Sequence, residues 1–187
     1  MGTVSCGFSS IRLWAMLLGL LVTSLAIAQP SATADQVKAA YILKFGGYLD
    51  WPASAFRDDE APLVICVAGS PAIYEELTRI SVGRHVQRRR VEVRRVQSPE
   101  QVGAAHLLFV GDAAWKDAAS WLQATRGKAV AVVTDASRGL ETGALLAFVE
   151  VENRVRFEAS LRAAEQARVQ LSARLLAVAS RVSGATQ

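Results

Sequence analysis

Few residues of this chain have the types and spacing that enzymes use. The sequence contains no G-x-x-x-x-G-K-[ST], G-x-G-x-x-G, G-x-S-x-G or H-E-x-x-H motif. Its two histidines are His85, which lies among arginines, and His106, which begins an apolar run. We interpret His85 as a solvent-exposed residue and His106 as a hydrogen-bonded core residue. A zinc site built on these histidines and a cysteine would need further ligands from carboxylates, and the spacing of the carboxylates in the sequence does not match a known zinc motif. We therefore predict no catalytic residue, no metal site and no cofactor.

Cys66 and the residues after it allow two further kinds of chemistry. Cys66 lies inside the apolar run 63–69, and burial raises a thiol's pKa and makes it inert. A small core residue is the favoured interpretation, with a redox-sensing thiol or an intermolecular disulfide as the alternative. Gly69 and Ser70 join the carboxyl end of that strand to a helix, where α/β sheets often bind ligands. They are possible ligand-binding residues, although the same residue types also form ordinary connections.

Two segments concentrate charge. Residues 84–95 contain six Arg and one Glu, which indicates a charged edge strand or a docking surface for an acidic partner or an anionic membrane. The segment lacks the interleaved aromatics of nucleic-acid binding. In the second segment, alternation places Arg154, Arg156 and Glu158 on one strand face. That face is either a surface charge ladder or a polar patch for a partner or ligand.

The amino terminus predicts export. Residues 13–28 carry no charge, follow Arg12 and end in Ala-Ile-Ala, which is typical of a cleaved signal peptide. We expect a signal peptide over 1–28, a polar tether over 29–34 and one domain over 35–187. Cleavage would remove Cys6 and leave Cys66 without an intramolecular partner. At 51% hydrophobic and 20% charged residues, the composition excludes intrinsic disorder.

The elements that must position these residues alternate between strands and helices. This order predicts a three-layer α/β/α sandwich with a mostly parallel central sheet, a C-terminal hairpin and a long last helix. Expected helices cover 35–48, 71–80, 113–125 and 161–182. Expected strands cover 63–69, 90–94, 106–111 and 129–135, followed by the hairpin strands 145–151 and 154–158 on either side of Glu152-Asn153.

Several segments together resemble the YfiR-like periplasmic proteins. They are KAAYILKFGGYLDWP (38–52), VICVAGSP (64–71), the basic stretch 83–93, HLLFV (106–110) and, most specifically, NRVRFEASLRAAEQARVQLSARLLAVA (153–179). The resemblance implies an α/β/α sandwich in the periplasm, often a homodimer, without enzymatic activity. It also implies an inhibitor that binds the periplasmic sensor domain of an inner-membrane diguanylate cyclase. Release of such an inhibitor raises cyclic-di-GMP and favours biofilm formation.

From the patch and the resemblance we predict partner contacts at Arg154, Arg156, Glu158, Leu161 and Arg168, and at exposed apolar positions of the last helix. No nucleic acid is expected as a partner. A periplasmic small-molecule binding module, using the strand end near Ser70, is the alternative function. An exported enzyme of unknown type is the third.

The chain departs from the family pattern in places. Ala105 stands where members often carry a Cys that pairs with the position of Cys66, and a later Cys pair near 135–152 is absent. Redox control through intramolecular disulfides is therefore not expected. Family members usually carry Ile-Asn directly after the NRVRFE motif, where this chain has Ala159-Ser160. They usually carry a small residue followed by Gly-Leu where this chain has Ala167-Arg168-Val169.

Overall fold

An eight-stranded, mostly parallel sheet forms the centre of the structure. The computed structural model describes residue 2 and residues 32–184, so the predicted signal peptide lies outside the described residues. The strand order is β10-β8-β7-β6-β5-β2-β4-β3. Parallel pairing joins β4, β2, β5, β6 and β7, whereas β8 runs antiparallel to β7. The strands are β2 (Leu63–Ala68), β3 (His85–Val86), β4 (Arg89–Arg95), β5 (Leu107–Val110), β6 (Ala131–Thr134), β7 (Leu146–Val151), β8 (Arg154–Ser160) and β10 (Arg181–Ser183).

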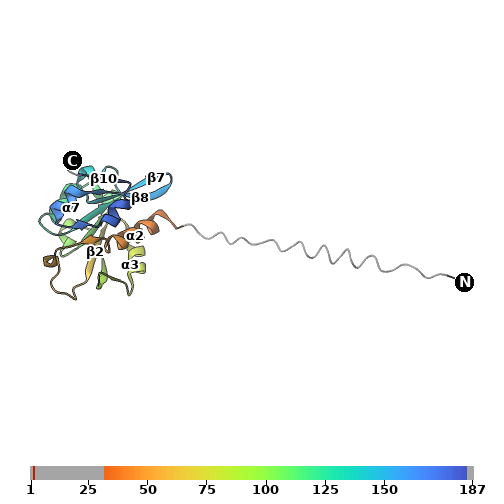
Figure 1. The fold of residues 1–187 in the computed structure, drawn as a ribbon, viewed down its shortest axis with the longest axis horizontal. Helices are drawn as coiled ribbons and strands as arrows, with labels where there is room; N and C mark the ends of the chain where they lie inside the picture. Colours follow the sequence, from red (N-terminus) through yellow and green to blue (C-terminus); the bar gives the residue numbers. More distant parts are fainter. Residues whose placement is uncertain (1, 3–31, 185–187) are drawn as a thin grey trace. The chain divides into compact units, whose positions relative to one another are not determined.

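Helices cover both faces of this sheet, which confirms the predicted three-layer α/β/α sandwich (Figure 1). One core cluster packs α2, α3, α7 and α8 on the first face, and a second cluster packs α4 and α5 on the other. The helices are α2 (Ala34–Phe45), α3 (Pro71–Ser81), α4 (Asp112–Trp115), α5 (Ala118–Thr125), α6 (Gly139–Thr142), α7 (Leu161–Ala167) and α8 (Ala173–Val178). A separate two-stranded sheet joins β1 (Leu49–Asp50) to β9 (Gln170–Leu171).

The local sequence explains the first half of the fold. All six residues of β2 are buried because the strand has helices on both faces, as its unbroken apolar run predicts. Ser70 caps α3 by accepting a hydrogen bond from the Ile73 backbone N–H, as expected for a strand-to-helix junction. Thr33 caps α2 in a reciprocal capping box with Gln36. This helix therefore begins one residue earlier than predicted, and it ends at Phe45, before the turn at Gly46-Gly47.

The predicted helix over 113–125 is wrong in its continuity. Two short helices, α4 and α5, replace it, with a break at Lys116 and Asp117. Asp117 has φ −109° and ψ 44°, which is outside the helical region. Its side chain accepts a hydrogen bond from the Ser120 hydroxyl. A short polar side chain that bonds locally favours a turn over a continuous helix.

The predicted long helix over 161–182 is also wrong. The first helix, α7, stops at Arg168, whose φ of 56° is left-handed, and β9 follows. Ser172 then caps α8 by accepting from the Leu175 N–H. The chain becomes extended at Ala179 and adds β10 alongside β8. Apolar residues at helical spacing fit two short helices equally well, and the cap at Ser172 is the local signal that separates them.

Candidate functional site

The β7–β8 hairpin positions the charged strand that the sequence singled out. Glu152 and Asn153 form its two-residue turn with φ of 50° and 59°, the positive values that a tight hairpin turn requires. The predicted hairpin is therefore confirmed. Figure 1 shows β7 and β8 reaching beyond the neighbouring strands. The register places Val151 opposite Arg154 and Val149 opposite Arg156.

Alternation along β8 separates a core face from a solvent face. Phe157 is 1% exposed and lies against Phe45, with ring centroids 5.0 Å apart. Its neighbours Arg156 and Glu158 therefore point to the opposite side of the sheet, as predicted. We call this side the docking face. It consists of Val149, Val151, Arg154, Arg156, Glu158 and Arg181.

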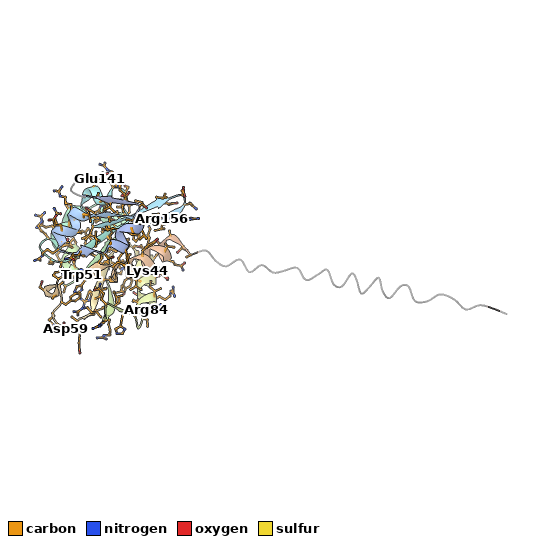
Figure 2. All side chains as sticks on the ribbon, in the orientation of Figure 1. Lys44, Trp51, Asp59, Arg84, Glu141 and Arg156 are labelled. Atoms are coloured by element: carbon orange, nitrogen blue, oxygen red, sulfur yellow. The ribbon has the colours of Figure 1, made fainter. Side chains whose placement is uncertain are left out.

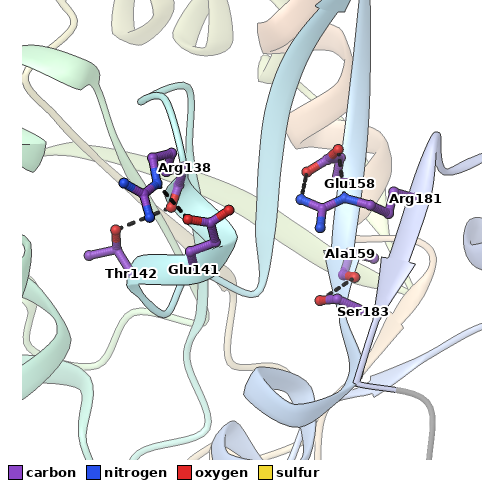
Figure 3. Close-up of polar contacts among 7 residues, drawn as sticks. All are labelled: Arg138, Glu141, Thr142, Glu158, Ala159, Arg181 and Ser183. Carbon is purple, nitrogen blue, oxygen red and sulfur yellow. Dashed lines mark hydrogen bonds and ion pairs between the residues drawn. The ribbon is translucent and has the colours of Figure 1, made fainter.

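Glu158 forms an ion pair across to β10. The Arg181 guanidinium donates two hydrogen bonds to the Glu158 carboxylate, at 3.0 Å and 2.6 Å (Figure 3). The carboxylate raises the pKa of Arg181 above its ordinary value. The Glu158 side chain is 18% exposed and that of Arg181 is 52% exposed. Arg181 was not predicted as a site residue, because the expected helix over 161–182 includes it, whereas the structure places it in β10.

Arg154 and Arg156 give the docking face its unbalanced charge. Both side chains are exposed, and neither forms an ion pair within residues 32–184. Val151, 43% exposed beside Arg154, adds an apolar contact point. The face therefore combines two exposed arginines, neither in an ion pair among the described residues, with an exposed valine at its rim. An acidic protein surface complements such a face.

The structure does not bring all five predicted contact residues together. Arg154 lies at the turn end of the hairpin, whereas Leu161 follows the other end of β8 and is half-buried. Arg168 bonds the Gly127 carbonyl oxygen, at 2.7 Å, beside the amino end of β6. The exposed valines, Val178 (60%) and Val182 (36%), belong to α8 and β10 rather than to one helix. The docking face thus includes three of the predicted residues.

The strand end at Gly69 and Ser70 is filled by the neighbouring residues Gly111 and Ala114. A Cβ added at Gly69 would lie 2.6 Å from the Ala114 Cβ, and one added at Gly111 would lie 3.0 Å from the Gly69 carbonyl oxygen. Ser70 uses its hydroxyl as the α3 cap. The loops after β2 and β5 are therefore packed against each other where the sequence suggested a ligand.

The buried titratable groups are held in place by structural contacts. Cys66 is fully buried, and burial raises the pKa of its thiol to about 11. The His106 ring stacks on Phe56, bonds the Ala55 carbonyl oxygen through Nε2, and accepts from the Val64 N–H through Nδ1. Burial lowers its pKa. Within residues 32–184, no group of three His, Cys, Asp or Glu side chains is placed to hold a metal ion.

The basic segment occupies the far edge of the sheet. It forms β3 and β4, with Arg89 3.7 Å above the Phe56 ring and Arg94 paired to Glu92. Figure 2 shows Arg84 and Arg156 toward opposite ends of the described structure, as the strand order requires. This segment is therefore separate from the docking face.

The described part of the chain is an α/β/α sandwich with an exposed charged hairpin, and its buried Cys66 and His106 lie in structural contacts. The chain belongs to the YfiR/HmsC-like family, whose model matches residues 35–180. This confirms the resemblance drawn from its motifs. Members of this family are periplasmic, non-catalytic regulators associated with membrane diguanylate cyclases. No helix in the described part of the chain is long and apolar enough to cross a membrane.

Similarity to a solved structure from Vibrio cholerae supports the fold. A conserved domain protein from Vibrio cholerae O1 biovar El Tor aligns with a TM-score of 0.50 and 13% identity, over 81% of this chain and 61% of that one. The ABC domain in complex with L-Trp from Streptococcus pneumoniae aligns with a TM-score of 0.46 and 11% identity, over 64% of this chain and 54% of that one. This chain thus spans less than two thirds of either structure. No curated protein matches its sequence.

Proposed function

We propose that this chain binds the periplasmic sensor domain of an inner-membrane diguanylate cyclase and represses that enzyme, which controls cyclic-di-GMP and biofilm formation. The docking face on β7, β8 and β10 makes the contact. The observation that carries the proposal is the pair of exposed arginines, Arg154 and Arg156, on a hairpin that extends beyond the sheet. Family membership supports the choice of partner.

Repression requires the chain to bind one conformation of the sensor more tightly than the other, because a ligand shifts an equilibrium only by its differential affinity. Arg154 and Arg156 are suited to this role because a guanidinium forms paired hydrogen bonds with a carboxylate. Acidic side chains presented by one sensor conformation would be recognised in this way. Charge complementarity of this kind also speeds association and selects the partner.

Export to the periplasm and a homodimeric state belong to the same proposal. The charge-free run 13–28 supports cleavage near Ala28 and release on the outer side of the inner membrane. β10, the last strand of the sheet, has three residues, and its outer edge is a candidate place for a second copy. A secretion assay with an amino-terminal sequence, together with the mass of the purified chain in solution, tests both points.

Gene deletion and complementation test the regulatory role. Loss of the chain should raise cellular cyclic-di-GMP in a strain that encodes the cognate cyclase, and wild-type protein should restore the low level. The double variant Arg154→Glu/Arg156→Glu should fail to restore it while reaching the same periplasmic abundance. Unchanged cyclic-di-GMP on deletion, or full complementation by the double variant, contradicts the proposal.

A charge swap assigns the role of Glu158. Glu158→Arg breaks the pair with Arg181, and Arg181→Glu in the same chain restores a pair of opposite charges in reversed order. If Glu158 only holds β10, the double variant should repress like wild type. Contact of Glu158 with the partner predicts that repression stays lost in both variants.

A further inference from the structure

A pocket lies at the amino ends of β6 and β7, the opposite end of these strands from the hairpin turn. Residues that precede the two strands line it, together with the last turn of α5 on one side and α7 on the other. Its volume is about 530 Å³. Pockets that hold small organic molecules fall in the range of about 300–1,000 Å³. The pocket is therefore large enough for a small ligand.

The deep part of this pocket is apolar. Val130, Val132 and Leu145 line it and are 3%, 4% and 1% exposed. Leu122 from α5 and Ala163 from α7 add apolar atoms on either side. Contact with these side chains would remove the apolar body of a ligand from water, which is favourable in proportion to the area buried.

The mouth of the pocket is positively charged. Arg126 and Lys128 line it with exposed side chains, and neither forms an ion pair among residues 32–184. Among the described residues, its lining includes no carboxylate. Two uncompensated donors beside an apolar wall favour an anionic head group, because charge-assisted hydrogen bonds are stronger than neutral ones.

Arg168 joins the two walls of the pocket. Its guanidinium donates to the Gly127 carbonyl oxygen at 2.7 Å, which links the end of α7 to the turn that carries Arg126 and Lys128. The backbone of Arg168 is left-handed, with φ 56°, a conformation that favours glycine. Arg168 thus positions the turn that carries Arg126 and Lys128. It does so from a backbone conformation that residues other than glycine rarely adopt.

We propose that this pocket binds a small amphipathic organic anion. The apolar body lies against Val130, Val132 and Leu145, and a carboxylate, sulfonate or phosphate head meets Arg126 and Lys128. This site is separate from the docking face, so the proposal goes beyond the proposed function. The proposed site lies at the amino ends of the parallel strands, whereas Ser70 lies at their carboxyl ends.

Fluorescence titration with 1-anilinonaphthalene-8-sulfonate, an aromatic sulfonate, tests the proposal. Wild-type protein should bind one molecule per chain in a saturable way. Arg126→Glu/Lys128→Glu should weaken binding at least about tenfold, because attraction and charge-assisted hydrogen bonds are replaced by repulsion. Both side chains are exposed, so the fold should be retained, as circular dichroism would verify.

The matched control is Arg154→Glu/Arg156→Glu, which changes the net charge equally on the docking face and should bind the dye like wild type. Ala167→Leu, which fills the pocket from α7, should also weaken binding. Decanoate should displace the dye, and decyltrimethylammonium, with the same chain length and a positive head, should not. Equal weakening by both charge-reversal pairs, unchanged binding in Arg126→Glu/Lys128→Glu, or equal displacement by the cationic amphiphile would overturn the proposal.

Discussion

Replacement of His106 by phenylalanine should destabilise the fold by about 2 kcal/mol. The imidazole Nδ1 accepts the Val64 N–H at 3.1 Å in a buried position, and Nε2 lies 3.1 Å from the Ala55 carbonyl oxygen. Phenylalanine keeps the ring that stacks on Phe56 at 4.2 Å but accepts no hydrogen bond. An unsatisfied buried N–H costs about 1–3 kcal/mol. For a domain of this size the loss corresponds to about 4–8 °C in Tm.

Urea denaturation and amide exchange measure this effect. His106→Phe should lower the free energy of unfolding and speed exchange of the Val64 amide, whereas His85→Phe at an exposed position should change stability by less than about 0.5 kcal/mol. Wild-type stability with an equally protected Val64 amide in His106→Phe would refute the assignment of this hydrogen bond.

The same site predicts a pH dependence. Burial, with a smaller effect from Arg89, lowers the pKa of His106 below the value of 6.5 that it has when unfolded. The unfolded chain therefore binds more protons between the two values, and stability falls as the pH is lowered through about 6.5. It levels off below the folded pKa. The difference between wild type and His106→Phe isolates this contribution, because carboxylates titrate in both proteins. A difference that stays constant from pH 7.5 to pH 5 would contradict it.

Three other positions give direct tests. Cys66 should not react with a disulfide reagent at pH 8 in the native chain but should react fully in urea, since its pKa is about 11 and it is buried; rapid native reaction would contradict this. Asn153→Gly should raise stability by about 0.5–1 kcal/mol because its φ of 59° is left-handed, and a lower Tm would count against the turn. Gly139→Ala should lower stability by about 1–3 kcal/mol, because the added Cβ would overlap the buried Thr134 methyl group; an unchanged Tm would show that the contact relaxes freely.

The sequence predicted the elements whose pattern depends on local burial. The continuous apolar runs that form β2, β5 and β6 are buried on both faces, and alternation in β8 separates Phe157 from Arg156. The turn at Glu152-Asn153 was also predictable, because Asn tolerates positive φ and lies between two strand-like runs.

The segment after β8, residues 161–184, could not be predicted in the same way. Its β9 and β10 are two and three residues long, and they form because β1 and β8 offer pairing partners distant in sequence. The spacing of apolar residues within 161–182 does not indicate that β9 and β10 pair with these strands. Because one helix was expected over 161–182, neither the pairing of Arg181 with Glu158 nor the contact of Arg168 with the Gly127 carbonyl oxygen was predicted. The pocket lined by Arg126 and Lys128 was also not predicted, because α5 and α7, which are distant in sequence, both line it only in the folded chain.

Binding to the isolated periplasmic domain of the cognate diguanylate cyclase would show whether β7, β8 and β10 contact this partner. Isothermal titration calorimetry would compare wild type, Arg154→Glu/Arg156→Glu and Arg126→Glu/Lys128→Glu, which carry equal charge changes on two separate surfaces. The first double variant should lose at least about tenfold in affinity, because two exposed arginines would meet acidic partner groups. The second should bind like wild type. Equal affinity for all three proteins, or a loss confined to the pocket variant, would contradict a contact through β7, β8 and β10.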